Sequence, residues 1–517
     1  MRSGLSDQGE SKVKSSEDFD PSYEPRQGLR RLTHRDADWS GLRILVAGLG
    51  VSGFAAADAL WERGAVVTVV SADSTSAIED RAQILAILEV DVRLGPEHLL
   101  EVPEGTELVV TSPGFRPDHP LLLAAAEHAI PVWGEVELAW RMRPQSGAAP
   151  WITVTGTNGK TTTVKMLACI LGAAGLRATS AGNVGTPLLE AVLHPDPYDV
   201  LAVELSSFQL HWQRSVAPVA SVCLNFAPDH IDWHGSLEEY RRAKAKVYEG
   251  TRIACVYNVQ DHATEQMVRD ADVVEGCRAI GFTLGLPGPS MLGLVDDVLA
   301  DRAFVEQRKT SAAELATLAD LQGDSPSVAP HNVANALAAA ALARAYGVGP
   351  LSVREGLRAF VPDPHRIADV ATVDGVRFID DSKATNPHAA AASLVSFEHV
   401  VWIGGGLLKG ADVDALVQSV ADRLRGVVLI GADRQQIAVA LMRHAPDVPV
   451  VDVPDTDTGV MDLVVARAGD LAQRGDVVLL APAAASMDMF DNYGARGDAF
   501  AEAVHRYASR HDGPAAS

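Results

Sequence analysis

The chain has 517 residues, of which 47% are hydrophobic, and carries a formal net charge of −23 at pH 7. This length supplies about three domains with cores of their own. The acidic balance argues against nucleic acid or an anionic membrane surface as the main partner. Four cysteines, Cys169, Cys223, Cys255 and Cys277, have the spacing of neither a disulfide framework nor a metal site. Because no apolar run is long enough to span a bilayer, we expect a cytoplasmic protein without membrane insertion.

The N-terminal region predicts a tail followed by a nucleotide-binding pattern. Residues 1–38 are rich in Ser, Asp, Glu, Arg and Pro, which predicts a disordered tail. Strand Leu42–Ala47, turn Gly48–Gly53 and helix Phe54–Arg63 then form the G-x-G-x-x-G fingerprint in a strand–turn–helix context. Asp73 lies where a ribose-binding acid is expected. The pattern indicates a diphosphate site or a tight packing of helix on strand, and taken alone it favours NAD.

A second glycine-rich turn lies between an apolar strand, Trp151–Val154, and a predicted helix, Val164–Leu171. It reads Gly-Thr-Asn-Gly-Lys-Thr-Thr over residues 156–162. In such a loop, backbone N–H groups and the positive end of a helix dipole face a polyphosphate. The lysine neutralises its charge, and the threonine can ligate Mg²⁺. The turn departs from G-x-x-x-x-G-K-[ST] because Val154 stands at the first glycine. We interpret it as a nucleoside triphosphate site rather than a plain Gly-Lys turn.

Three candidate features follow this loop: an acid, a cluster of Asp and His residues, and a lysine. Glu204 ends the strand Val200–Val203, where a metal-ligating acid is expected, although a capping Glu before a helix explains it too. The cluster Asp229–His234 follows the next strand and either binds a hard cation or phosphate or is polar surface. Lys244 lies four residues from Tyr240 and from Tyr248, along the sheltered side of a predicted helix over Leu237–Tyr248 that is otherwise mostly charged.

The remaining sequence predicts the edge of this domain and a third one. Residues 262–330 indicate small strands and loops laid over the central domain. In the alanine-rich helix that follows, Asn332 and Asn335 share one face and can hydrogen-bond a base or ribose, while helix capping explains Asn332 equally well. The pattern restarts near residues 362–366. Four further strands alternate with helical segments and predict a parallel sheet with ligand-binding turns at one edge: Val376–Ile379, His399–Ile403, Gly426–Ile430 and Val477–Leu480.

The joint order of these motifs resembles one family, the ATP-dependent Mur ligases of peptidoglycan synthesis. The motifs are Gly-Thr-Asn-Gly-Lys-Thr-Thr (156–162), Glu-Leu-Ser-Ser-Phe-Gln-Leu (204–210), Asp-His (229–230), His-Asn-x-x-Asn-Ala (331–336), Pro-His-Arg (364–366) and Asp-Ser-Lys-Ala-Thr-Asn (381–386). The string Ala-Ser-Met-Asp-Met-Phe-x-Asn-Tyr at 485–493 is similar to the branch that adds D-glutamate. The Asp-Asn-Pro-Arg motif expected of the branch that adds a diamino acid is absent from the sequence.

The resemblance implies an α/β protein of three domains after the tail. We expect a Rossmann-like domain for the UDP-substrate over residues 39–147 and a central P-loop ATPase-type domain over 148–363. A second Rossmann-like domain, for the amino acid and nucleotide, is expected over 364–517. The implied activity is an ATP-dependent ligation of D-glutamate to UDP-N-acetylmuramoyl-L-alanine through an acyl phosphate. We expect a monomer whose partners are these two substrates.

The resemblance also implies residue roles. Lys160 is expected to span the β- and γ-phosphates, Thr161 and Glu204 to hold one Mg²⁺, and His230 and Lys244, as a carbamate, to hold a second. The expected nucleotide contacts are Gly156, Thr157, Asn158, Gly159, Lys160, Thr161, Thr162, Asn332, Asn335, Arg366 and Asp381. The expected substrate contacts are Gly50, Val51, Ser52, Ser112, Pro113, Gly114, Asn183, Ser206, Gln209, Lys383, Thr385, Ser486, Met487 and Tyr493. Where the family carries an Asp-Thr-Arg contact for uracil, this chain has Ser71 and Asp73 around Ala72, so the resemblance does not supply those contacts.

Three other hypotheses compete. Another Mur ligase or a folylpolyglutamate synthase shares the phosphate loop, but the D-glutamate-type strings and the N-terminal diphosphate domain count against both. An NAD-dependent dehydrogenase built on Gly48–Gly53 leaves the phosphate loop and the Lys383 region unexplained. A non-catalytic nucleotide switch has no need of a second metal site at His230 and Lys244.

Overall fold

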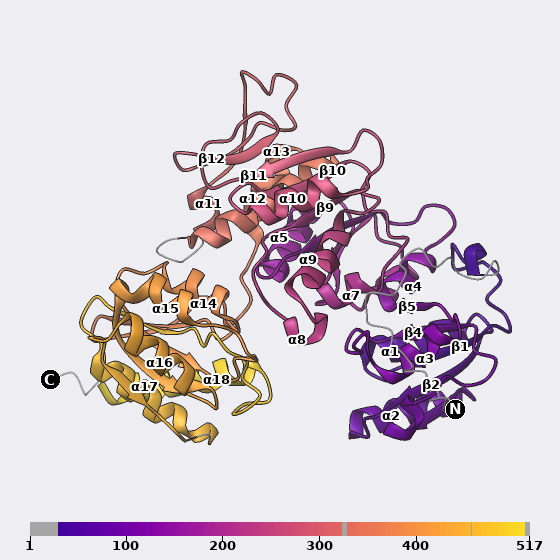
Figure 1. Ribbon diagram of the computed structural model, residues 1–517. Helices are drawn as coiled ribbons and strands as arrows, with labels where there is room; N and C mark the ends of the chain where they lie inside the picture. The colour runs from indigo at the N-terminus through magenta and orange to yellow at the C-terminus, as the bar shows by residue number, and fades with distance from the viewer. Residues whose placement is uncertain (1–28, 323–327, 456, 512–517) are drawn as a thin grey trace, which may run out of the picture. The chain divides into compact units, whose positions relative to one another are not determined.

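The computed structural model describes residues 29–322, 328–455 and 457–511 (Figure 1). The chain divides into two compact units. Within the described residues, the first unit comprises residues 29–149 together with Thr186–Pro197 and Phe208–Val216, and the second comprises the others. Three sheets with flanking helices confirm the predicted α/β fold of three domains, and the second unit holds two of these sheets. The exact domain boundaries remain a prediction.

The first unit is built on a parallel five-stranded sheet in the order β3-β2-β1-β4-β5. Its apolar strands are buried on both faces by helices, as expected of a parallel sheet. Strand order reverses at β1, so the turns after β1 and β4 meet at one edge. The strands are β1 (Arg43–Ala47), β2 (Val66–Ser71), β3 (Asp91–Leu94), β4 (Leu108–Thr111) and β5 (Val132–Gly134); the helices are α1 (Val51–Trp61), α2 (Ser76–Ile87), the 3₁₀ helix η3 (Pro96–Leu99), α3 (Pro120–Glu127), α4 (Glu135–Arg141), α6 (Leu188–Leu193) and α7 (Ser207–His211).

Two buried acids on α4 explain why later segments of the chain belong to the first unit. The Glu135 carboxylate accepts from the backbone N–H of Leu188 at 3.2 Å. Glu137, which is 0% exposed, accepts from the Ser215 hydroxyl at 2.6 Å and pairs with Arg141. Because a buried carboxylate must be fully hydrogen-bonded, these contacts fix both returning segments against α4.

The predicted disordered tail is wrong for its last ten residues. Leu29–Arg31 form a 3₁₀ helix, and the side chains of Leu29 and Leu32 are each 2% exposed. The Arg141 guanidinium donates to the Leu32 carbonyl at 3.2 Å. Two anchoring leucines in an otherwise polar stretch give no periodic signal, which explains the error. Residues 1–28 lie outside the described part of the chain.

The second unit contains a nine-stranded sheet in the order β14-β13-β12-β11-β10-β9-β6-β8-β7. Strand β6 lies between β8 and β9, where the strand order reverses, so their carboxyl ends share one edge. The strands are β6 (Trp151–Thr155), β7 (Ala178–Gly182), β8 (Val200–Glu204), β9 (Ala220–Cys223), β10 (Ala254–Asn258), β11 (Arg278–Phe282), β12 (Met291–Val295), β13 (Val298–Asp301) and β14 (Ala313–Thr317); the helices are α5 (Lys160–Ala173), α8 (Ile231–His234), α9 (Leu237–Ala245), η4 (Lys246–Tyr248), α10 (His262–Asp270), α11 (Leu318–Gln322), α12 (Pro330–Tyr346) and α13 (Pro350–Ala359).

Two local predictions in this region need correction. Strands β11 to β14 are not laid over the domain; they continue its sheet, because their alternating apolar residues join the same core. Helix α12 begins at Pro330 with Ala329 as its N-cap, so Asn332 does not cap it. Eleven of the 17 residues of this alanine-rich helix are buried, among them all of 335–343, as expected for a helix that is apolar on most of its surface.

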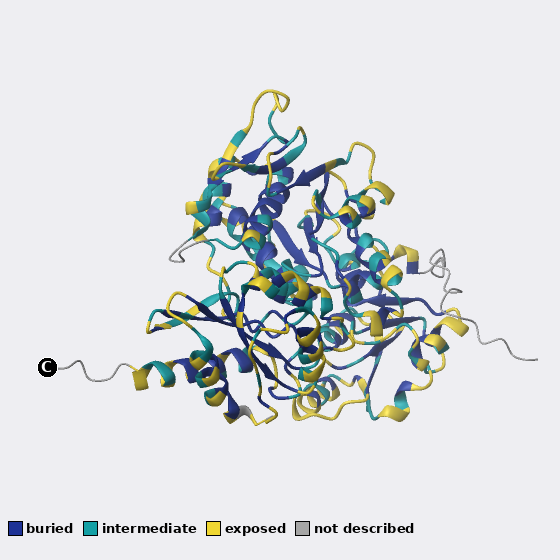
Figure 2. Cartoon of the chain, turned by 60° about the vertical axis from the view of Figure 1, so that its left-hand side comes forward, coloured by how far each residue is buried: buried dark blue, intermediate teal, exposed yellow. Residues whose placement is uncertain are grey.

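The third sheet is six-stranded, in the order β15-β16-β20-β17-β18-β19, and is parallel except for the edge pair β15–β16. Apolar clusters cover both of its faces, and Figure 2 shows its strands buried beneath more exposed helices. The elements are β15 (Ala368–Val373), β16 (Val376–Asp380), β17 (Val400–Gly405), β18 (Leu424–Ile430), β19 (Val450–Asp452), β20 (Val477–Leu480), α14 (Pro387–Leu394), α15 (Asp414–Val420), η5 (Ala421–Arg423), α16 (Arg434–His444), η6 (Thr458–Val460), α17 (Met461–Leu471) and α18 (Tyr493–His511). Among the described residues, no helix has the length and apolarity that crossing a membrane requires.

Candidate active site

The phosphate loop joins β6 to α5 and has the geometry that the sequence predicts. Gly159 is the N-cap of α5 in the left-handed region, with φ 83°. A Cβ there would overlap the Asn335 side chain, so a glycine is required both by conformation and by the close approach of α12. The backbone N–H groups of the first helical turn have no intrahelical acceptor. They therefore point a set of donors toward any anion at the mouth of the loop.

An asparagine that the sequence analysis did not single out fixes the loop. Asn225, which follows β9, accepts from the Thr157 N–H at 3.0 Å through its carbonyl. Its side chain accepts from the Asn158 N–H at 2.8 Å and donates to the Asn158 carbonyl at 3.1 Å. The Thr157 hydroxyl is also hydrogen-bonded, 3.1 Å from the Tyr240 hydroxyl. These contacts fix the backbone of the loop from β9 and α9.

Two lysines converge on one carbonyl oxygen of this loop. The Lys160 ammonium donates to the Gly156 carbonyl at 3.0 Å, and the Lys244 ammonium donates to the same oxygen at 2.8 Å. Burial lowers the pKa of both groups, to about 7 for Lys244, which also feels the charge of Lys160. The expected sheltered position of Lys244 is confirmed, since its side chain is 2% exposed.

An acid, a histidine and an amide lie around these lysines. Glu204 ends β8 and is 1% exposed; its Oε1 accepts from the Asn183 amide at 2.8 Å. Its other oxygen, Oε2, is buried and has no hydrogen-bond partner within the described residues. His230 lies in the left-handed region with φ 52°, and burial lowers its pKa, so its ring is neutral at pH 7. Its Nε2 is 3.6 Å from Asp229.

The sign of the charges at this edge of the sheet fits a polyphosphate. Lys160 interacts electrostatically with the carboxylates of Glu204 and Asp229 and with the cationic Lys383 and Arg366. Lys244 adds a further cation at pH values below its pKa. With Lys165 and Asp363 of the same site included, three carboxylates face five basic side chains, so the balance favours an anion of high charge.

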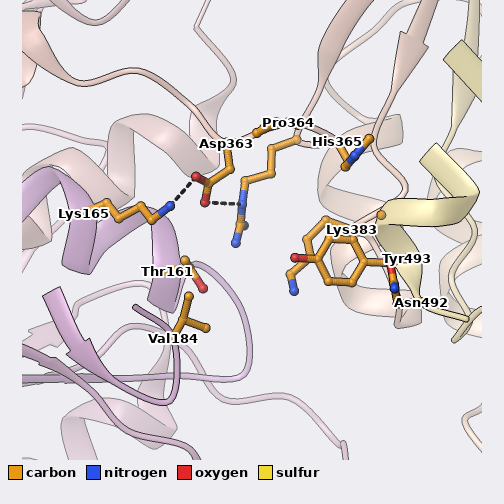
Figure 3. Close-up of a pocket in the computed structure, with 11 residues that line it drawn as sticks. Thr161, Lys165, Val184, Asp363, Pro364, His365, Lys383, Asn492 and Tyr493 are labelled. Carbon is orange, nitrogen blue, oxygen red and sulfur yellow. Dashed lines mark hydrogen bonds and ion pairs between the residues drawn. The ribbon is translucent and has the colours of Figure 1, made fainter. Parts of the chain in front are cut away.

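A cavity of about 420 Å³ opens beside the loop (Figure 3). It brings together Thr161 from α5, Lys383 from the turn after β16, and Tyr493 at the start of α18. Arg366 lines it too, where the Asp363 carboxylate pairs with both Arg366, at 3.7 Å, and Lys165. The lining residues are Thr161, Lys165, Val184, Asp363, Pro364, His365, Arg366, Lys383, Asn492, Tyr493 and Gly494. Predicted nucleotide and amino-acid contacts therefore share one cavity.

The expected amino-acid contacts come from two neighbouring turns of the third sheet. The Lys383 ammonium lies 3.7 Å from the ring centroid of Tyr493, above its face. Burial, with the charge of Arg366, lowers the pKa of Lys383 to about 8. Ser486 is buried with its carbonyl bonded to the N–H groups of residues 489 and 490, whereas Met487 is 71% exposed. Thr385 is half-buried, two residues beyond Lys383.

Some predicted residues are not brought to the cavity. The Asp381 carboxylate faces into the third sheet's domain, where it accepts from the Ser393 hydroxyl and the Ile367 N–H. A ribose contact there stays a prediction that requires the side chain to leave these partners. Asn335 lies against Gly159, as a nucleotide contact would require, whereas Asn332 is only half-buried beside it. Ser206 precedes α7 in the second unit and Gln209 is buried in the first.

The first unit carries its own candidate site at the turn after β1. Gly48 has φ +95°, and a Cβ on it would lie 2.7 Å from the Ser112 hydroxyl. That hydroxyl is buried and has no hydrogen-bond partner within the described residues. Gly50 and Val51 are exposed at the same turn. An unsatisfied hydroxyl beside a glycine-rich turn suits a bound diphosphate.

The other predicted contacts of the first unit provide weaker support for a substrate site. Ser52, in the first turn of α1, hydrogen-bonds the buried Glu135, whose pKa is raised by burial. Pro113 and Gly114 follow Ser112 at the surface. Ser71 is buried as the last residue of β2 and Asp73 is exposed, so neither observation supplies the missing uracil contacts.

Three residues of this site were missed because each lacks a local signal. Asp363 stands in a Pro-Asp-Pro turn that marks a boundary, not a ligand. Tyr240 was noted only as a neighbour of Lys244. Asn225 follows a strand next to the phosphate-loop strand, and that position could have identified it, since adjacent parallel strands end at the same edge.

These features match one family over most of the chain. The Mur ligase MurD-like N-terminal domain matches residues 42–134, the Mur ligase middle domain residues 154–343, and the glutamate ligase domain of the Mur ligases residues 365–484. The chain therefore belongs to the Mur ligase family of ATP-dependent ligases.

Two similar proteins from Streptomyces species have the same name. The chain is 62% identical to the UDP-N-acetylmuramoylalanine–D-glutamate ligase of Streptomyces avermitilis over 467 residues, 90% of this chain and 98% of that protein. It is 60% identical to the enzyme of the same name from Streptomyces coelicolor, over 90% and 98% of the two chains.

A solved structure of a more distant protein agrees on the fold. The UDP-N-acetylmuramate–alanine ligase of Thermotoga maritima is 19% identical and superposes with a TM-score of 0.53, covering 91% of this chain and 100% of that one. At this identity the likeness bears on the fold alone.

Proposed function

We propose that the chain joins D-glutamate to UDP-N-acetylmuramoyl-L-alanine with hydrolysis of ATP to ADP and phosphate. The observation that carries this proposal is the shared cavity of the second unit, which Thr161 of the phosphate loop and Lys383 and Tyr493 of the third sheet all line. The relatives that share most of the chain's length bear the name of this activity. A cytoplasmic, monomeric enzyme is part of the same proposal.

The proposed chemistry explains why cations dominate the site. The substrate carboxylate attacks the γ-phosphate of ATP and gives an acyl phosphate and ADP; the amine of D-glutamate then attacks the acyl carbon, and phosphate leaves. An anion approaches an anion in the first step, so charge neutralisation and alignment limit the rate more than proton transfer does. Lys160 would neutralise the β- and γ-phosphates, and the N–H groups at the start of α5 would align them. Arg366 would approach the nucleotide from the same cavity.

The residues present fit a magnesium ion at the phosphate loop. The buried Oε2 of Glu204 lacks a partner, and a hard oxygen of this kind is the ligand that Mg²⁺ prefers. Glu204 and Thr161 would hold this ion, which supplies charge neutralisation on the phosphates when bound. The described residues contain no cluster of three or more His, Cys, Asp or Glu side chains able to bind a metal by themselves. Phosphate oxygens would therefore complete the coordination.

A second ion is proposed at His230 and Lys244. A bare ammonium repels Mg²⁺, but the neutral amine reacts with CO₂ to give a carbamate and a proton, which turns the side chain into an anionic oxygen ligand. With its pKa at about 7, about half of Lys244 is neutral at pH 7. The neutral ring of His230 is the form that binds metals.

The binding of D-glutamate is proposed at the two turns after β16 and β20. Lys383 offers a point charge for one carboxylate, and backbone N–H groups near Ser486 suit the other. The UDP end of the first substrate is proposed at the turn after β1 in the first unit. There the partnerless Ser112 hydroxyl supports a contact to the diphosphate or its nucleoside.

Phosphate release tests this proposal directly. The assay contains ATP, Mg²⁺ and UDP-N-acetylmuramoyl-L-alanine with D-Glu, L-Glu, L-Ala or meso-diaminopimelate, for the wild type, Lys160→Ala and the exposed-lysine control Lys309→Ala. Release that requires D-Glu, is lost in Lys160→Ala and persists in Lys309→Ala is expected. Release with a different amino acid would reassign the chain to a sister ligase. Sedimentation velocity of the same samples tests the monomer.

A further inference from the structure

A buried arginine of α18 connects the two turns at which D-glutamate binding is proposed. Arg496 lies in the first turn of the helix and is 1% exposed. Its Nε donates to the Ser382 hydroxyl at 2.9 Å and its Nη2 to the Ser382 carbonyl at 2.8 Å. Its Nη1 donates to the Ala484 carbonyl at 3.1 Å. Ser382 immediately precedes Lys383, so one guanidinium fixes both turns next to their proposed ligand groups.

The helix itself gains nothing from an arginine at this position. The first turn of a helix carries partial positive charge, so a cation there is unfavourable. Burying a guanidinium is costly as well, and no carboxylate of the described residues lies within ion-pair distance of Arg496. The nearest counter-charges, Asp488 and Asp380, act over a longer range. Burial lowers the pKa of Arg496 to about 10, so it remains charged at pH 7.

The groups that Arg496 holds are ones that would otherwise move. Ala483 has φ +60°, a left-handed conformation that a non-glycine residue keeps only when its surroundings fix it. The Arg496 bond to the next carbonyl, that of Ala484, supplies part of this restraint. The Ser382 hydroxyl in turn donates to the Tyr493 carbonyl at 2.7 Å. Through Ser382 the arginine thus positions both Lys383 and Tyr493, which form a cation–π pair.

We propose that Arg496 is a positioning residue for the amino-acid substrate, because it ties the Lys383 turn to the Ser486 turn. It touches neither substrate nor nucleotide. This inference rests on the proposed function, since it names the residue that shapes the D-glutamate subsite. Its removal loosens two turns that bind the amino acid. The phosphate loop keeps its own contacts with Asn225, although its Asn158 also meets Asn386 and His388 just beyond the Lys383 turn.

The test compares Michaelis constants in the phosphate-release assay for wild type, Arg496→Met, Arg496→Lys and Ser382→Ala. Arg506→Met is the matched control, because Arg506 lies on the same helix, exposed and paired with Asp462. In Arg496→Met the KM for D-Glu is expected to rise about tenfold or more, while the KM values for ATP and the UDP-substrate stay within about twofold. Arg496→Lys, which keeps the charge and fewer hydrogen bonds, should recover part of the loss. Ser382→Ala should shift the same KM in the same direction.

An unchanged KM for D-Glu in both Arg496→Lys and Ser382→Ala would overturn the inference, even if Arg496→Met does not fold. A parallel rise of all three KM values would also overturn it, because that pattern means general damage to the third sheet. Failure of the wild type to use D-Glu is a different result: it overturns the proposed function, and this inference with it. Normal use of D-Glu by Arg506→Met is expected throughout.

Discussion

Replacing Lys244 by methionine is expected to abolish activity and yet stabilise the protein below pH 7. The side chain is 2% exposed, and its ammonium donates to one acceptor, the Gly156 carbonyl, at 2.8 Å. No carboxylate of the described residues lies within ion-pair distance of it. A cation in this position is poorly solvated, and methionine fills nearly the same volume without a charge.

The size of the effect follows from the pKa. Burial, with the charge of Lys160 next in importance, lowers the pKa of Lys244 from 10.5 to about 7. A change of this size corresponds to roughly 5 kcal/mol against the charged form. Losing the bond to Gly156 returns about 1–3 kcal/mol. The net gain for methionine is then about 2–4 kcal/mol, or about 4–16 °C in the melting temperature of a domain of roughly 200 residues.

The stability advantage of Lys244→Met over the wild type should decrease as the pH rises. The folded state binds the Lys244 proton less tightly than the unfolded chain does, so the cost is fully present below pH 7. It declines as the pH rises and is gone above about 10.5, where both states are neutral. The advantage of Lys244→Met should therefore be largest at pH 6 and negligible near pH 10.5.

Thermal unfolding from pH 6 to 10.5 in CO₂-free buffer measures this advantage, with the exposed Lys309→Met as control. Added bicarbonate should stabilise the wild type and leave Lys244→Met unchanged, because only the wild type can form the carbamate. A variant that melts at or below the wild-type temperature at pH 6, with no convergence at higher pH, would refute the argument that Lys244 is held as a destabilised cation. Activity in Lys244→Met would refute its proposed metal role.

Three further outcomes follow from single contacts. Glu204→Gln keeps the shape of the side chain and its contact with Asn183 but removes the charge. The Mg²⁺ concentration for half-maximal phosphate release should therefore rise about tenfold or more. An unchanged concentration would show that Glu204 does not bind the ion. Ser112→Ala should raise the KM for the UDP-substrate about three- to tenfold with the KM for ATP unaltered, and equal effects on both would contradict a site confined to the first unit. Asp301→Ala removes a buried carboxylate that pairs at 2.9 Å with the half-buried Arg344. The substitution should cost about 3 kcal/mol in urea unfolding, and a loss below about 1 kcal/mol would show that water reaches the pair.

The functional residues that directly follow a strand are the ones best predicted from the sequence. Gly159, Glu204 and Lys383 could each be placed because strand and helix patterns locate the carboxyl edge of a parallel sheet, and the turn residues lie just beyond it. The corrected elements depend on partners far away in the chain. Glu137 is hydrogen-bonded to Ser215, 78 residues later, and this contact fixes the Ser215 segment in the first unit. No local sequence pattern predicts such a contact. Arg496 likewise has no local sequence signal for its role, because its acceptor Ser382 is 114 residues away.

Two ammonium groups on one carbonyl explain why the two lysines of the loop behave differently. Lys160 and Lys244 both donate to the Gly156 oxygen, but Lys160 also donates to the Thr157 carbonyl at 2.9 Å, and its charge lowers the pKa of Lys244. We expect the repulsion between the two ammonium groups to be relieved in two ways: Lys244, whose pKa is lowered to about 7, would give up its proton, and a polyphosphate would neutralise Lys160. A carbamate at Lys244 would convert the repulsion into attraction before any nucleotide binds. A bound polyphosphate, in contrast, would raise the Lys244 pKa and suppress its reaction with CO₂. If Lys244 is carbamylated, we therefore expect this step to precede nucleotide binding.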